Sequence, residues 1–318
     1  MWRLGKSEHP CFISGSPRSG TTWIMEVLAR ISYARVHWEP INWYLYELDH
    51  DRLSGDQNWM RPDAEILAGD DDYASEFRRT LSGSAPRRPA MARISELSQF
   101  KNMMRLLTAG RTIIKFVYAQ RALRWLKNNS SAKGCIILRH PSAVVASQLH
   151  HPYHKAGHAN QHPEWTVEVI SRVHPIYSDE DLSKFPQIND ILSWDLSPAR
   201  KLAVTACLDL LSSISDAELR QSYTFAVYES LVDNPNNFLK IAQALGLPVV
   251  HQPTIETLRQ RSRTTSSSDK GSGAKRLEDT ERAEIQRIID AFGIDFYQAD
   301  GSVNIQRLSE RGFSHLVA

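Results

Sequence analysis

The stretch from Phe12 to Trp23 limits the possible folds of this chain more than any other. It starts in a short apolar run, becomes a loop of small residues between Gly15 and Gly20, and passes into a segment with helical periodicity. The apolar positions of that segment repeat as one buried helix face does: Trp23, Ile24, Val27, Leu28 and Ile31. A strand, a small-residue loop and a helix start place unpaired backbone N–H groups and the positive end of the helix dipole at the loop. The stretch therefore predicts an anion-binding site.

The loop also carries side chains that suit an anion. Arg18 supplies a cation, and Ser19, Thr21 and Thr22 supply hydroxyl donors. The alternative is a tight turn that binds nothing, but an arginine, two threonines and two glycines at one helix start favour a site. A loop for nucleoside triphosphates has lysine directly after its second glycine, where it reaches the β- and γ-phosphates. Thr21 occupies that position here, so a γ-phosphate is a poor fit.

A second segment repeats the same plan farther along the chain. The apolar run from Cys135 to Leu138 predicts a strand, and Arg139 follows it directly. Pro141 suits the first turn of a helix, and Ser147 lies about two turns along that helix. In nucleoside triphosphatases an acidic residue often ends such a strand and serves magnesium. An arginine at this point suits a second anion and not a metal.

Both segments resemble the sulfotransferases that use 3′-phosphoadenosine-5′-phosphosulfate (PAPS). The residues from Ser16 to Trp23 resemble the family's 5′-phosphosulfate loop, in the arginine form that is frequent in its carbohydrate and protein-tyrosine branches. Arg-x-Pro from Arg139, with five residues before Ser147, resembles its 3′-phosphate motif. The resemblance implies an α/β fold, with a parallel sheet flanked by helices, of the P-loop nucleotide-binding type. It also implies these PAPS contacts: Ser16, Pro17, Arg18, Ser19, Gly20, Thr21, Thr22 and Trp23, with Arg139 and Ser147 at the 3′-phosphate.

Glu39 is the predicted general base. The run from Val36 to Trp38 predicts a short strand, and Pro40 keeps Glu39 extended just beyond it. Ligands bind at the carboxyl ends of strands in open parallel sheets, although the residues alone favour a solvated surface carboxylate. The resemblance decides for the base, because sulfotransferases with an arginine-type loop often carry a Glu-Pro pair about this far downstream.

An apolar strand is predicted from Thr112 to Tyr118, and it lacks the histidine that serves as base in other members of the family. Many family members have Lys-Thr-His on this strand, with the histidine as base. Lys115 is present here, but Val117 stands at the histidine position, which strengthens the assignment of Glu39. Lys115 either approaches the transferred group or is a strand-end lysine that keeps its ammonium in water, and both interpretations stay open.

Two further nucleotide contacts come from the resemblance. The segment from Tyr228 to Leu231 is similar to the family's Tyr-Glu-x-Leu element, which is mostly structural there, and only Tyr228 is carried over as a contact. The basic stretch 261–276 has the composition of a flexible linker. Its likeness to a loop that closes over the nucleotide implies contacts from Lys270 and Gly271. The match is imperfect, because Ser-Gly-Ala follows where the family has Gly-Asp-Trp.

The chain is expected to form one domain over residues 1–318, and weaker sequence patterns indicate how its other segments are organised. Segments 51–90 and 150–190 are expected to be mobile insertions, with an acidic turn at Asp70–Asp72. The histidine-rich stretch 150–162 is interpreted as an acceptor loop and not as a metal site, because prolines and a glycine interrupt it. The run from Tyr223 to Val227 is expected to be the last core strand, followed by a helix with Asn234 as cap and Pro235 in its first turn.

Composition narrows the class of partner. An apolar fraction of 42% supports a full core, and a formal net charge of +2 makes no case for nucleic acid or membrane binding. Three scattered cysteines are expected to be buried free thiols. The sequence shows no signal peptide and no apolar run of membrane-spanning length, so a cytoplasmic protein is expected. The oligomeric state, a homodimer included, stays open.

The predicted function is transfer of a sulfuryl group from PAPS to a hydroxyl or amine of a carbohydrate, glycolipid or other small molecule. Transfer is expected in line, with Glu39 as base, Arg18 as catalytic cation and no metal. One alternative is a P-loop kinase or phosphotransferase, which the absence of the loop lysine and of a strand-end aspartate disfavours. Another is a non-catalytic nucleotide-binding module, which the joint presence of Arg18, Glu39, Arg139 and Ser147 disfavours.

Overall fold

The computed structural model describes most of the predicted site, but not all of it. Glu39, Lys270, Gly271, the histidine-rich stretch from residue 151 onward and most of the basic loop lie outside the described residues. The described residues are 10–38, 71–82, 110–117, 119–150, 183–194, 197–250, 254, 256, 258 and 276–318.

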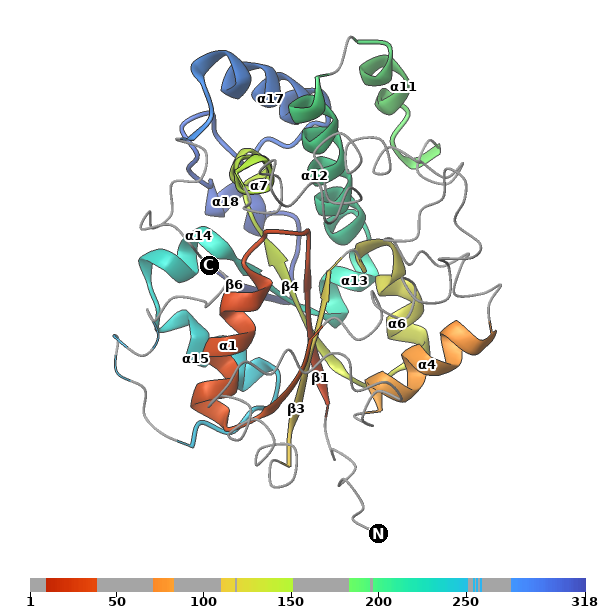
Figure 1. Ribbon diagram of the computed structural model, residues 1–318, viewed down its shortest axis with the longest axis vertical. Coiled ribbons are helices and arrows are strands. Elements are labelled where there is room, and N and C mark those ends of the chain that lie inside the picture. The colour runs from red at the N-terminus through yellow and green to blue at the C-terminus, as the bar shows by residue number, and fades with distance from the viewer. Residues whose placement is uncertain are drawn as a thin grey trace, which may run out of the picture.

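Within these residues, the chain folds around a six-stranded sheet in the order β2-β3-β1-β4-β5-β6 (Figure 1). Every neighbouring pair of strands is parallel. The strands are β1 (Cys11–Gly15), β2 (Arg35–Trp38), β3 (Thr112–Val117), β4 (Lys133–Leu138), β5 (Thr224–Val227) and β6 (His315–Val317). The predicted α/β fold with a parallel sheet is confirmed.

Helices cover both faces of the sheet, since alternate residues of each strand point to opposite sides. Phe12 packs in a core cluster with residues of α12 (Pro198–Ile214) and α17 (Asp279–Ala291). Its neighbours Cys11 and Ile13 pack in a second cluster with α1 (Thr21–Ser32) and α15 (Asn237–Ala244). The three cysteines are buried free thiols, as predicted.

The strand order places a switch point at β1. After β1 the chain runs outward to β2 and returns to β3, and it then crosses to β4 on the other side of β1. Gly15 at the end of β1 is in register with Ile137 near the end of β4. The loops that follow these two strands therefore leave the sheet side by side, at the edge where open α/β sheets bind ligands.

Two predicted boundaries are wrong. The run ending at Val227 is not the last strand, because the C-terminal tail returns as β6 and pairs in parallel with β5. The helix expected at Pro235 begins later: α14 (Tyr228–Asp233) follows β5 at once, and α15 starts at Asn237. Asn234 Oδ1 accepts a hydrogen bond from Asn236 N at 3.2 Å, so Asn234 still caps the turn that leads into α15, as predicted.

Both segments predicted as insertions contain helices that reach the core. The acidic turn expected at Asp70–Asp72 is corrected, since Asp71 begins α4 (Asp71–Leu81). Phe77 of α4 is buried and stacks on Phe116 of β3 with ring centroids 5.1 Å apart. Ile188 of α11 (Gln187–Leu192) is buried as well.

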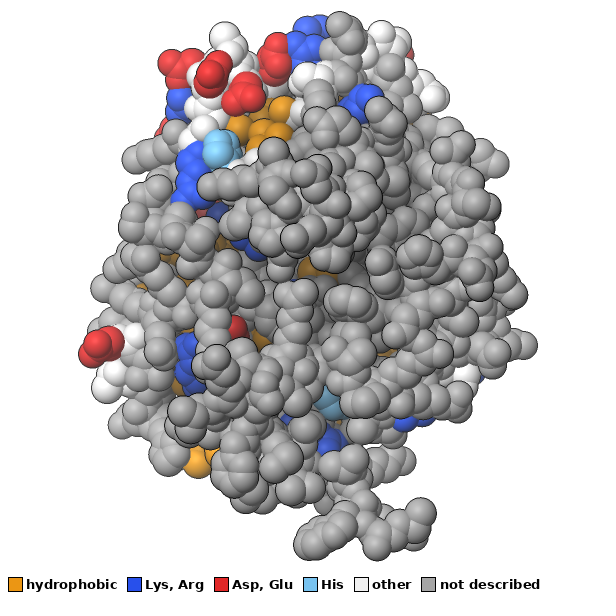
Figure 2. Space-filling view, in the orientation of Figure 1, with side chains coloured by type: hydrophobic (Ala, Val, Ile, Leu, Met, Phe, Trp, Pro, Cys, Tyr) orange, Lys and Arg blue, Asp and Glu red, His pale blue; other side chains and the backbone are white. Residues whose placement is uncertain are grey.

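Charged side chains of α17 form ion pairs at the surface. Acidic and basic side chains lie close together near α17 on the face drawn in Figure 2, and Arg282 pairs with Asp279 while Arg200 of α12 pairs with Glu284. Among the described residues, every helix is too short or too polar to cross a lipid bilayer.

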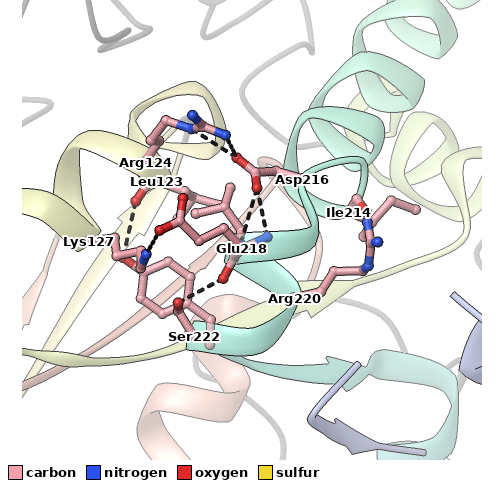
Figure 3. Close-up of polar contacts among 10 residues, drawn as sticks. Leu123, Arg124, Lys127, Ile214, Asp216, Glu218, Arg220 and Ser222 are labelled. Carbon is pink, nitrogen blue, oxygen red and sulfur yellow. Dashed lines mark hydrogen bonds and ion pairs between the residues drawn. The ribbon is translucent and has the colours of Figure 1, made fainter. Parts of the chain in front are cut away.

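Asp216 ties two surface helices together and carries a stability prediction (Figure 3). Its carboxylate caps α13 (Ala217–Ser222), accepting from Glu218 N at 2.9 Å, and it accepts from Arg124 Nε of α6 (Leu123–Asn129), also at 2.9 Å. Asp216→Ala is expected to lower the free energy of unfolding by about 1–2 kcal/mol, measured by urea denaturation. Asp216→Asn keeps a good cap and should lose less.

The same carboxyl gives this stability a pH dependence. Burial alone would raise the pKa of Asp216, but hydrogen bonds from Arg124 and two backbone N–H groups outweigh it and lower the pKa below 3.8. Stabilisation by a group with a depressed pKa is complete above its unfolded value and disappears as pH falls through the folded value. The difference in stability between wild type and Asp216→Asn should therefore be constant at neutral pH and shrink below about pH 4. A difference that grows on acidification would contradict this.

Candidate active site

The loop after β1 is shaped to present the start of α1. Arg18 and Gly20 have φ of 68° and 91°, in the left-handed region, and Ser19 N donates to Ser16 O at 2.9 Å. Gly20 is also required for space, because a Cβ there would lie 2.3 Å from the ring of Tyr228. The loop therefore turns sharply, and α1 begins directly after Gly20.

The first turn of α1 offers backbone donors. Ile24 N donates to Gly20 O at 3.1 Å, so the N–H groups of Thr21 and Thr22 lie ahead of the intrahelical ladder. Gly20 is the N-cap residue, and no side-chain cap hydrogen bond forms there among the described residues. These N–H groups and the positive end of the helix dipole suit an anionic ligand.

Three hydrogen bonds bring the two predicted motifs together. Arg139 Nη1 donates to Arg18 O at 2.5 Å, and Arg18 Nε donates to Ser147 Oγ at 3.2 Å. Ser147 belongs to α7 (Pro141–Leu149), and its neighbour Gln148 donates through Nε2 to Pro17 O at 3.3 Å. Residues about 120–130 positions apart in sequence thus form one site containing two guanidinium groups.

Aromatic rings pack against the residues of this site. The Arg139 guanidinium carbon lies 4.2 Å from the centroid of the Tyr228 ring, which is a cation–π contact. Trp23 packs edge-on against Tyr228 at 5.6 Å and against Phe238 at 5.0 Å. Trp23 therefore connects the loop to the core, and Tyr228 holds both Gly20 and Arg139 in place.

The remaining loop residues divide by burial. Ser16, Pro17 and Thr22 are half-buried, whereas Ser19 and Thr21 are buried. Ser19 turns back toward Gly15, where a Cβ would meet its Oγ at 2.5 Å. In the described part of the chain, Ser19 Oγ and Arg139 Nε are buried without a hydrogen-bond partner. Buried polar atoms usually have partners, so these two donors suit a ligand.

Lys115 lies in the sheet beside this site. It is in register with Ile13 of β1 and Trp38 of β2. Its side chain is only 3% exposed, so the interpretation of a lysine with its ammonium in water is wrong.

Sequence reasoning missed Glu229 and His140. Glu229 Oε1 accepts a hydrogen bond from His140 N at 3.0 Å. Burial raises the pKa of Glu229, opposed by that N–H group and by Arg139, and burial lowers the pKa of His140. His140 Nδ1 accepts from Ser142 N, so Nε2 carries the proton that it donates to Gln298 O at 2.9 Å. A carboxyl two residues after the end of a buried strand was the available signal.

Comparisons with known proteins give one family. The sulfotransferase domain model matches residues 8–290. Among solved structures, the sulfotransferase domain from the curacin biosynthetic pathway is 15% identical with a TM-score of 0.40, covering 91% of this chain and 99% of its own. The sulfotransferase domain from the Synechococcus PCC 7002 olefin synthase is 15% identical with a TM-score of 0.37, covering 93% and 99%. A comparison with curated proteins finds no match.

Proposed function

The chain belongs to the sulfotransferase domain family, and we propose that it moves a sulfuryl group from PAPS to a hydroxyl or amine of a carbohydrate, glycolipid or other small molecule. The observation that carries this proposal is the junction of Arg18, Arg139 and Ser147 at the start of α1. Two arginines, joined because Arg139 Nη1 donates to the Arg18 carbonyl, suit a ligand with two separate anionic groups.

The hydrogen-bond donors of this site fit PAPS, because PAPS carries a 5′-phosphosulfate and a separate 3′-phosphate. We assign the 5′-phosphosulfate to Arg18 and the N–H groups of Thr21 and Thr22, with the other loop residues shaping the turn. We assign the 3′-phosphate to Arg139 and Ser147, since Arg139 Nε is a buried donor with no partner in the described segments. Tyr228 adds an aromatic surface beside them. Lys270 and Gly271 are proposed to close over the nucleotide, as part of a single domain spanning the chain.

In the proposed mechanism, PAPS supplies the sulfuryl group and leaves as the 3′,5′-bisphosphate. Glu39 takes the proton of the acceptor hydroxyl, whose oxygen attacks sulfur in line as the bond from sulfur to the bridging oxygen breaks. Arg18 and the helix N–H groups stabilise the negative charge that develops on the bridging oxygen and the leaving phosphate. As in phosphoryl transfer, positioning and charge neutralisation carry most of the catalysis.

A binding experiment tests the donor site without a known acceptor. We expect 3′,5′-adenosine bisphosphate to bind and to raise the melting temperature without a metal. Arg139→Ala should weaken binding by at least about tenfold in calorimetry, because a charge-assisted contact to the 3′-phosphate is lost. Arg282→Ala, a change in an exposed pair on α17, is the matched control and should bind as wild type does.

The alternatives predict different results in the same titration. A kinase or other phosphotransferase would prefer ATP with magnesium, which would overturn the proposal. A non-catalytic module would bind the bisphosphate but release none from PAPS when hydroxylated compounds are supplied. The transfer reaction is supported only if both binding and acceptor-dependent release occur.

A further inference from the structure

We propose that Glu229 is a positioning residue that sets the selectivity of this site for a 3′-phosphate, by holding the turn that carries Arg139. The inference rests on the proposed function, in which Arg139 binds that phosphate. Glu229 does not touch the ligand in this account. It acts through the backbone of the residue next to Arg139.

Neighbouring strands bring the four residues of this arrangement together. Leu138 at the end of β4 is in register with Val227 at the end of β5. Arg139 and His140 follow one strand, while Tyr228 and Glu229 follow the other, so two short segments leave the sheet next to each other. Because the strands are parallel and paired to their last residues, the sheet itself sets the distance between these segments.

The contacts between the two segments are matched residue by residue. The Tyr228 ring lies under the Arg139 guanidinium at 4.2 Å, and Glu229 Oε1 accepts from His140 N at 3.0 Å. One residue thus holds the Arg139 side chain, and the next holds the peptide group that joins Arg139 to His140. Together they define the direction in which the guanidinium leaves the backbone.

The rest of the turn leaves little freedom to compensate. His140 is 1% exposed, its two ring nitrogens bond Ser142 N and Gln298 O, and its ring packs against Tyr297 with centroids 4.7 Å apart. If the carboxyl is removed, the His140 N–H group is left buried without a partner. The peptide is then expected to rotate toward another acceptor, and that rotation turns Arg139 away from its place.

The Tyr297 hydroxyl, which faces Glu229, does not accept a hydrogen bond from the His140 N–H group in its place. Electrostatic contacts reach it from Arg139, Asp233 and Tyr297. Tyr297 Oη and Glu229 Oε2 are both buried without a hydrogen-bond partner in the described part of the chain. Tyr297 Oη thus makes no hydrogen bond to the His140 N–H group, and loss of the Glu229 carboxyl is expected to change the backbone that orients Arg139.

The test compares two ligands that differ only in the 3′-phosphate: 3′,5′-adenosine bisphosphate and adenosine 5′-monophosphate. Glu229→Ala should weaken binding of the bisphosphate about tenfold to a hundredfold and change binding of the monophosphate little. Glu229→Gln keeps an oxygen acceptor for His140 N and should stay within about threefold of wild type. Glu218→Ala, at an exposed carboxylate on α13, is the matched control.

The ratio of the affinities for the bisphosphate and the monophosphate distinguishes a role in positioning Arg139 from a general loss of structure at the site. Equal weakening of both ligands, or a wild-type ratio in Glu229→Ala, would overturn the inference. If Glu229→Ala does not fold, Glu229→Asp serves instead, since its shorter side chain withdraws the carboxylate from His140 N and should lower the ratio about tenfold. Wild-type protein without preference for the bisphosphate would overturn the proposed function itself, whereas a preference that the variants keep overturns the positioning role alone.

Discussion

Arg18→Ala is expected to lower kcat for sulfuryl transfer by about 100- to 1,000-fold. The Arg18 guanidinium lies between the start of α1 and helix α7, and its Nε donates to Ser147 Oγ at 3.2 Å. Charge on the bridging oxygen and the 5′-phosphate grows toward the transition state, so a fixed cation there stabilises that state more than the bound substrate. Acceptor-dependent release of the bisphosphate from PAPS measures the loss.

Two controls separate the charge of Arg18 from its part in the loop. Alanine adopts the left-handed φ of 68° no more readily than arginine, so the substitution does not relieve the backbone. Ser147→Ala removes the hydrogen bond to Arg18 Nε but keeps the cation, and it should weaken PAPS binding more than it lowers kcat. If Arg18→Ala keeps kcat within about threefold of wild type, the catalytic assignment of Arg18 is wrong.

The strands and helices that carry the candidate site were predictable because their signals are local. The end of β1, the loop and the start of α1 are consecutive, and small residues with an apolar period mark them directly. Arg139 and Ser147 were found in the same way, at the end of β4 and on α7. That the two motifs touch follows from β1 and β4 being adjacent parallel strands, which a sequence pattern alone does not display.

Other parts of the fold leave little trace in the sequence. β6 has only three residues, and its pairing with β5 uses backbone groups that every residue carries. The start of α4 is a run of aspartates, which is also typical of an exposed turn. Glu229 bonds a backbone N–H group 89 residues earlier in the chain, and such a partner has no side-chain signature.

Glu39 lies outside the described residues, so its assignment as base stays a proposal, and only the strand before it is described. Trp38 at the end of β2 is in register with Lys115 of β3, and Lys115 with Ile13 of β1. Adjacent strands lie about 4.8 Å apart, so Trp38 lies roughly 10 Å from Ile13, which is two residues before β1 ends at Gly15. β2 is separated from β1 by one strand, and this order supports the proposal that a residue following β2 acts on an acceptor next to the loop after β1.

Glu39→Gln is therefore expected to lower kcat by about 100- to 10,000-fold, because the amide keeps the size of the side chain but does not take a proton. Binding of 3′,5′-adenosine bisphosphate should stay close to wild type, since the base acts on the acceptor and not on the nucleotide. The loss of kcat at low pH that a carboxylate base causes in the wild type should also disappear in the variant. Calorimetry and the pH dependence of bisphosphate release measure these effects. Near-normal turnover in Glu39→Gln would exclude Glu39 as the base and leave Lys115, buried in the adjacent strand, as the next residue to replace.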